Sequence, residues 1–109
     1  MADACIFCDI VAKKAPADVV HEDDRVLVIK NVQPQAPVHL LVIPKEHHPN
    51  LDSLSDRDLL ADMVATAKQV GDEQSGEKGY RLNINSAKQA DIGHIHLHVL
   101  GGLDKETAL

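Results

Sequence analysis

Three histidines alternate with apolar residues near the end of the chain, in the run His94-Ile95-His96-Leu97-His98-Val99. Side chains alternate between the two faces of a β-strand, so the three imidazoles of such a strand share one face, about 7 Å apart. An imidazole, with its ordinary pKa of about 6.5, can serve as nucleophile, base or acid near neutral pH. A phosphoryl centre suits such a group, because one neutral imidazole can attack while a neighbouring imidazolium stabilises oxyanion charge. We therefore predict a chemical site on this strand.

The histidine run is also compatible with a purification tag, a metal-binding edge or a polar cover on a solvated strand. A tag would be contiguous and terminal, and a solvated face normally varies its polar residues. The internal position and the uniform residue type therefore favour the chemical site.

The two cysteines, Cys5 and Cys8, have the spacing of half a tetrahedral thiolate zinc site. The alternatives are two buried reduced thiols and a redox pair. A redox pair of this spacing is typical of a βαβ setting, which the pattern here lacks. Zinc is therefore the favoured interpretation, and two more ligands are needed.

The elements that would position these residues follow from the periodicity of the apolar residues. A short helix over Ala4 to Lys13 would carry both cysteines, and Ser55 would cap a long helix that ends at Val70, before Gly71. The predicted strands are Asp18 to His21, Arg25 to Lys30, Val38 to Pro44, Tyr80 to Asn85 and His94 to Leu100. The sequence thus predicts an α+β fold with an antiparallel sheet, and His21 is interpreted as a structural residue.

Composition limits the class of protein. With 109 residues, 44% of them apolar and 2% aromatic, the chain suits one domain over residues 1–109 with an aliphatic core. Lys and Arg number 11 against 17 Asp and Glu, a net charge of -6 that argues against a nucleic-acid partner. The N-terminus lacks the features of a secretory signal, and the apolar run Leu40 to Ile43 is far too short to span a membrane. We expect a cytoplasmic protein with no membrane partner.

The chain resembles the histidine triad (HIT) superfamily, and within it the Hint-like purine nucleoside phosphoramidases. The segments that carry the resemblance are Cys5-Ile6-Phe7-Cys8-Asp9-Ile10-Val11, Glu22-Asp23-Asp24-Arg25, Pro34-Gln35-Ala36-Pro37-Val38-His39, Val42-Ile43-Pro44-Lys45, Gly79-Tyr80-Arg81 and the histidine run with the Gly101-Gly102 that follows it. The resemblance implies a HIT-like fold whose sheet extends across a homodimer. It also implies a hydrolase that converts purine nucleoside 5′-phosphoramidates, or related nucleotidyl conjugates, to the nucleoside monophosphate through a covalent nucleotidyl-histidine. AMP would be a ligand.

The resemblance also implies residue roles. His96 matches the nucleophile, His98 a phosphate contact, and His39 the histidine that supports and orients the nucleophile from a neighbouring strand. The other implied nucleotide contacts are Asn31 at the ribose, Asn83 at the phosphate, and an apolar slot for the purine formed by Ile6, Phe7, Ile10, Ile29 and Val32.

The zinc ligands implied by the resemblance are Cys5, Cys8, His47 and His94. His48 is an alternative to His47. Four protein ligands leave no position for water, so this zinc would be structural, and we expect no catalytic metal.

One segment departs from the family pattern. In Ala87 to Gly93, Asp91 stands where family members often have a hydroxyl that donates to phosphate, and a carboxylate there repels an anion. This departure favours an alternative, a nucleotide-binding or regulatory module with weak or no turnover. A third hypothesis is a zinc-handling protein without a nucleotide ligand.

Overall fold

The computed structural model describes residues 5–89 and 92–103. Its elements are α1 (Ile6–Val11), β1 (Val19–Glu22), β2 (Val26–Lys30), β3 (Val38–Pro44), α2 (Arg57–Ser75), β4 (Tyr80–Ile84) and β5 (Leu97–Gly101), with short 3-10 turns at Gly76–Lys78 and Ala87–Gln89. Within these residues, no helix is both long and apolar enough to cross a membrane.

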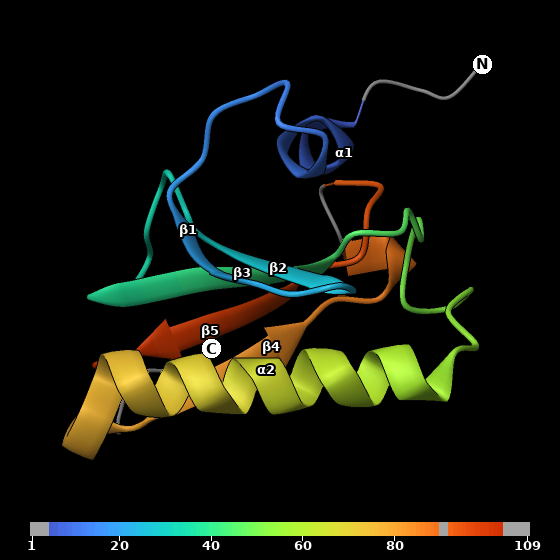
Figure 1. Ribbon diagram of the computed structural model, residues 1–109. Helices are drawn as coiled ribbons and strands as arrows, with labels where there is room; N and C mark the ends of the chain where they lie inside the picture. Colours follow the sequence, from blue (N-terminus) through green and yellow to red (C-terminus); the bar gives the residue numbers. More distant parts are fainter. Residues whose placement is uncertain (1–4, 90–91, 104–109) are drawn as a thin grey trace.

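The five strands form one sheet in the order β1-β2-β3-β5-β4, and every neighbouring pair is antiparallel. The sheet lies between two helices, with α1 on one face and α2 on the other (Figure 1). The histidine-bearing strand β5 sits between β3 and β4, away from both edges of the sheet. The predicted α+β fold with an antiparallel sheet, one long helix and a short N-terminal helix is confirmed.

The main core lies between the sheet and α2. Alternate residues of the central strands point to this side, and they bury their side chains against the apolar stripe of the helix. The cluster consists of Val26, Val28, Leu40, Val42, Leu59, Met63, Ala67, Val70, Ile95, Leu97 and Val99. This face of the sheet is therefore held by aliphatic burial.

The ends of α2 differ from the prediction. Its N-cap is Asp56 rather than Ser55, because the Asp56 carboxylate accepts a hydrogen bond from the Leu59 amide at 3.0 Å. The same carboxylate also pairs with Arg25 at 2.7 Å. The helix does not end before Gly71 but continues to Ser75. Gly71 is needed for packing, since a Cβ there would lie 2.8 Å from the Tyr80 ring.

The strand β5 is also shorter than predicted, since it begins at Leu97 and not at His94. The Ile95 amide donates at 2.8 Å to the carbonyl of His48, in the loop after β3. The backbone of His94 to His96 therefore lies outside the ladder.

Candidate functional site

The three predicted histidines of the run lie on the α1 side of the sheet. Phe7, from α1, makes edge-on ring contacts with His94 and His96 at centroid separations of 5.7 and 5.3 Å. The rings of His96 and His98 are 5.0 Å apart. The apolar residues that alternate with them pack on the α2 side. The predicted division of the run between two faces is confirmed.

The buried His96 is held by a main-chain group. Its Nδ1 lies 2.9 Å from the carbonyl oxygen of His94. A carbonyl can only accept, so Nδ1 carries the hydrogen and donates it. In the neutral ring the other nitrogen, Nε2, then has the lone pair. The backbone thus fixes the tautomer in which Nδ1 carries the hydrogen and Nε2 the lone pair.

A second chain of hydrogen bonds fixes the opposite tautomer of His98. The Gln35 amide donates to His39 Nδ1 at 3.0 Å, so the hydrogen of neutral His39 is on Nε2. That nitrogen donates to Nδ1 of His98 at 2.9 Å, which leaves the hydrogen of His98 on Nε2. Burial lowers the pKa of His39, which favours this neutral form.

The position of His39 corrects one detail of the prediction. It comes from the neighbouring strand β3, as expected, but its hydrogen bond goes to His98 and not to His96. The partner that orients His96 is the His94 carbonyl. Two neighbouring rings thus combine a lone pair on one and an N–H donor on the other, an arrangement that can attack a phosphorus atom and hold its oxygen.

The two predicted polar contacts flank these rings. Asn83 is the direct cross-strand partner of His98 on β4, so it shares the same face, where it is exposed. Asn31 follows β2, and its Oδ1 accepts from the Gln33 amide at 2.9 Å. Its Nδ2 lies 3.2 Å from His39 Nε2. The structure brings both asparagines to the histidine cluster from opposite sides.

The predicted purine slot is only partly assembled. Phe7, Ile10 and Ile29 are buried together in one cluster between α1 and the sheet. Ile6 is 49% exposed and Val32 is 92% exposed. A hollow of about 420 Å³ adjoins this cluster, and its lining includes Ile10 beside Lys13 and Lys14. The five residues therefore form a buried base with two exposed apolar side chains.

The predicted zinc ligands lie together. Ligand atoms of Cys5, Cys8, His47 and His94 are all within 4.8 Å of one another. The nearest separations are 3.1 Å for Cys8 Sγ to His47 Nδ1, 3.3 Å for Cys5 Sγ to His94 Nδ1, and 3.2 Å between the two histidine nitrogens. Tetrahedral zinc with ordinary bond lengths requires about 3.5 Å for sulfur to nitrogen and about 3.3 Å for nitrogen to nitrogen. The cluster can hold a metal ion.

Two further features fit this donor set. His94 Nε2 donates to the Pro44 carbonyl at 2.9 Å, which leaves the lone pair of Nδ1 directed at the other three residues. Burial, and then the adjacent Cys5, raise the pKa of the Cys8 thiol to about 11. A bound cation would reverse that shift, because it stabilises the thiolate. His48 instead bonds Glu46 at 3.0 Å, so it is not in the cluster.

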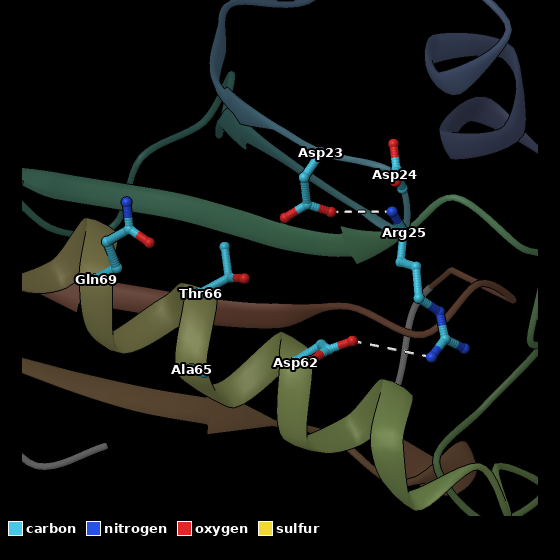
Figure 2. Close-up of a pocket in the computed structure, with 7 residues that line it drawn as sticks. All are labelled: Asp23, Asp24, Arg25, Asp62, Ala65, Thr66 and Gln69. Carbon is cyan, nitrogen blue, oxygen red and sulfur yellow. Dashed lines mark hydrogen bonds and ion pairs between the residues drawn. The ribbon is translucent and has the colours of Figure 1, made fainter.

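A separate hollow of about 450 Å³ lies between the β1–β2 turn and α2 (Figure 2). Its lining is Asp23, Asp24, Arg25, Asp62, Ala65, Thr66 and Gln69. The guanidinium of Arg25 is engaged by Asp56 at 2.7 Å and Asp62 at 3.8 Å. None of the lining residues belongs to the histidine or cysteine clusters.

Comparisons with known proteins identify the family of the chain. The family model described as "Scavenger mRNA decapping enzyme C-term binding" matches residues 4–107. An uncharacterised HIT-like protein from Synechocystis is 42% identical over 94% of this chain and 93% of its own. The chain therefore belongs to the histidine triad superfamily.

Two solved structures are close in shape. A HIT family hydrolase from Clostridium thermocellum superposes with a TM-score of 0.90, at 38% identity over 100% of this chain and 99% of that one. A zinc-bound histidine triad family protein from Mycobacterium smegmatis has a TM-score of 0.84, at 33% identity over 94% of this chain and 78% of that one.

Several groups at the site were missed by the sequence analysis because they belong to the main chain. They are the amide of Gln35 and the carbonyls of Pro44 and His94. Every residue offers such groups, so no residue type signals their use. Asp91, which the sequence analysis singled out, lies outside the described residues.

Proposed function

We propose that this protein hydrolyses purine nucleoside 5′-phosphoramidates, or closely related nucleotidyl conjugates, to the nucleoside monophosphate. The observation that carries the proposal is the hydrogen bond from His96 Nδ1 to the His94 carbonyl at 2.9 Å, which leaves the Nε2 lone pair of a buried ring for attack. Similarity to a protein named as a HIT family hydrolase supports the same class of reaction.

The reaction has two displacements at phosphorus. In the first, Nε2 of His96 forms a bond to phosphorus while the phosphorus–nitrogen bond to the amine breaks, and the departing nitrogen takes a proton from solvent water, so that it leaves as the amine. In the second, water attacks phosphorus and gives up a proton to the solvent while the bond to His96 breaks, and the nucleoside monophosphate is released. The Nε2–H of His98 donates to a phosphoryl oxygen and stabilises the charge that develops there.

The remaining residues bind the nucleotide in this proposal. Asn83 contacts the phosphate beside His98, and Asn31 contacts the ribose hydroxyls. The purine lies against Ile6 and Val32, which are exposed, over the buried Phe7, Ile10 and Ile29. His39 acts as a positioning residue, because its hydrogen bond sets the tautomer of His98.

We also propose that Cys5, Cys8, His47 and His94 hold a structural zinc ion. The separations of their ligand atoms support this, as does similarity to a histidine triad protein that is described as zinc-bound. Zinc would supply charge that keeps both thiols ionised and would join α1 to the strand region. No step of the hydrolysis uses it.

The proposal includes a homodimer, which the family resemblance implies. β4 lies at an edge of the sheet, and Leu82 on this strand is a large exposed apolar residue. Antiparallel pairing of two β4 strands would continue the sheet into a second copy. Light scattering coupled to size exclusion gives the mass that tests this.

The decisive experiment compares the wild type with His96→Ala. We expect the wild type to hydrolyse adenosine 5′-phosphoramidate and the variant to lose turnover, while calorimetry detects AMP binding to both. His21→Ala is the control, since His21 lies on the edge strand β1, away from the site, and pairs with the exposed Asp23 that follows this strand. Turnover by His96→Ala at the wild-type rate would refute the assigned nucleophile.

The second candidate is a nucleotide-binding module with weak or no turnover, which the carboxylate of Asp91 favours. The same experiment separates the two functions, because AMP binding by the wild type without hydrolysis would support the module. Zinc binding without any AMP binding would support a zinc-handling protein instead.

A further inference from the structure

The hollow between the β1–β2 turn and α2 lies on the face of the sheet that the proposed hydrolysis does not use (Figure 2). α2 forms one wall of it with Asp62, Ala65, Thr66 and Gln69, whose spacing of three and four places them on one stripe of the helix. The adjacent stripe of α2 is apolar and packs into the core. The volume of about 450 Å³ lies in the range of small-molecule sites.

Thr66 is the residue of this wall that points to a ligand. It is only 8% exposed. A threonine within a helix can satisfy its hydroxyl on the carbonyl one turn earlier, but the Thr66 hydroxyl makes no hydrogen bond to any residue that the structure describes. Figure 2 shows its side chain standing away from α2, toward the β1–β2 turn. A buried hydroxyl without a partner costs free energy, so a ligand in the hollow that bonds it gains affinity.

The opposite wall is the β1–β2 turn, and hydrogen bonds hold this turn in place. Asp23 Oδ1 accepts from the amides of Arg25 and Val26, each at 2.9 Å, and Oδ2 accepts from His21 Nε2 at 2.9 Å. The Arg25 guanidinium reaches Asp56, the N-cap of α2, at 2.7 Å. These bonds tie the turn to the helix, so the two walls are fixed relative to each other.

The charge of the lining selects a cation. The lining contains three carboxylates and one guanidinium. The guanidinium of Arg25 is already engaged by Asp56, and Asp62 lies only loosely against it, at 3.8 Å. A carboxylate and the Thr66 hydroxyl are both acceptors, so together they suit a positively charged donor.

An extended organic cation fits the lining better than a metal ion. Among the residues that the structure describes, the only group of three or more metal-binding side chains whose ligand atoms converge is the cysteine and histidine set described above. Asp23 bonds the amide of Arg25, whereas Asp62 lies near its guanidinium. The two carboxylates are therefore separated by about the length of an arginine side chain, which a linear molecule spans and a single ion does not.

We propose that this hollow is a binding site for a linear aliphatic diamine. One ammonium group pairs with Asp23, the other pairs with Asp62 and bonds the Thr66 hydroxyl, and the methylene chain lies over Ala65. Four methylene groups between two nitrogens give a chain of suitable length, so 1,4-diaminobutane is the probe. The inference does not depend on the proposed hydrolysis, because the histidines lie on the other face of the sheet.

The test is a titration of the ¹⁵N-labelled chain with 1,4-diaminobutane, followed by ¹H–¹⁵N correlation spectra at fixed pH and ionic strength. We expect saturable shifts of the amides of residues 23–26 and 62–69, and none for residues 94–98. A Kd of about 1 mM is expected, which is within the usual limit per non-hydrogen atom for so small a ligand. No shift up to about 20 mM, or shifts spread over all acidic segments, would overturn the inference.

Thr66→Val is the decisive variant, because it replaces the hydroxyl by a methyl group of similar size. Loss of a hydrogen bond to a charged group should raise Kd by about 10-fold. Asp62→Asn removes an exposed charge and should raise Kd by about 3-fold. An unchanged Kd in folded Thr66→Val would overturn the inference.

Asp58→Asn is the matched control for Asp62→Asn. Asp58 lies in the first turn of the same helix but does not line the hollow, so its replacement should leave Kd unchanged. The correlation spectra also show whether each variant is folded. If Thr66→Val does not fold, the difference between Asp62→Asn and Asp58→Asn decides the question, and equal values would overturn the inference.

Two other ligands test the class of cation. n-Butylamine carries one ammonium on a four-carbon stem, as a lysine side chain does, and it should bind about 5-fold more weakly than the diamine. Equal affinity would overturn the diamine in favour of a site for a single ammonium group. Mg²⁺ that shifts the same amides at lower concentration would overturn it in favour of a metal site.

Discussion

The two faces of the sheet are stabilised in different ways. On one face α2, with 19 residues, buries a continuous aliphatic cluster against the strands. On the other face α1 has six residues, and beside a smaller apolar cluster lie five histidines and two cysteines held by hydrogen bonds. Hydrophobic burial is non-directional, so the first face tolerates small shifts of its side chains. On the second face each hydrogen bond fixes the position of a particular nitrogen atom. The residues that stabilise the fold by apolar burial and the residues that could do chemistry therefore lie on opposite faces of the sheet.

The largest expected effect tests the apolar face. Met63 on α2 is 0% exposed, so Met63→Ala should lower the free energy of unfolding by about 2–5 kcal/mol. The rate of hydrolysis per folded molecule should stay unchanged, because Met63 lies across the sheet from the histidines. Urea unfolding and steady-state kinetics measure the two quantities.

The matched control for Met63→Ala is Val64→Ala. Val64 is the next residue on α2 but is 44% exposed, so this substitution should lower the free energy of unfolding by less than about 0.5 kcal/mol. A large loss of kcat in folded Met63→Ala would show that the faces are not independent.

The next effect tests the polar face. His39→Leu removes the donor to His98 Nδ1, so His98 no longer has a fixed tautomer. We expect kcat to fall by about 10- to 100-fold, the usual effect of losing such a partner. His21→Leu, on the edge strand β1, should leave kcat unchanged. Retention of full activity in His39→Leu would remove His39 from the proposed site.

A smaller effect is expected on acidification. Burial lowers the pKa of His39 below its ordinary value of 6.5, so the unfolded chain binds this proton first as the pH falls. The contribution of neutral His39 to the free energy of unfolding is complete above pH 6.5 and is lost as the pH falls below this value. Urea unfolding measures the free energy of unfolding at about pH 7.5 and about pH 5.5. The decrease in this free energy between the two pH values should be larger for wild type than for His39→Leu. Equal losses would contradict a neutral, buried His39.

The smallest effect concerns the end of α1. Lys13 has a φ of 64°, in the left-handed region that costs a residue with a Cβ about 1 kcal/mol or more. Lys13→Gly should therefore be more stable than Lys13→Ala by about 1 kcal/mol. Both variants lose the same ion pair with Glu22, so chemical denaturation of the two isolates the backbone term. Equal stability would indicate that α1 ends without strain.

The sequence predicted features that depend on neighbours in the chain or on the family pattern. Alternation placed His96 and His98 on one face, and the resemblance brought Cys5 and Cys8 together with His94, although these cysteines precede it by more than 80 residues. Details that depend on tertiary contacts were wrong. Gly71 was interpreted as a helix end, but it accommodates the Tyr80 ring within the helix.

The partner of His39 shows the same limit at the site. The family pattern placed this residue beside the nucleophile, but only the register of β3 against β5 decides which ring it reaches. His39 is the cross-strand partner of Leu100, which lies two residues after His98 on the same face of β5. Strand register depends on long-range pairing, so a motif does not determine it.

The place of β5 in the sheet has a consequence for the order of folding. β1, β2 and β3 are consecutive in the chain and can pair as hairpins. The second edge of β3 pairs only with residues 97–101, which follow α2 and β4 in the sequence. Closing so long a loop before its contacts form is slow, so docking of this strand should limit the folding rate. Until then the backbone groups of β3 stay open to pairing with another chain, and His98 has not been brought to His39.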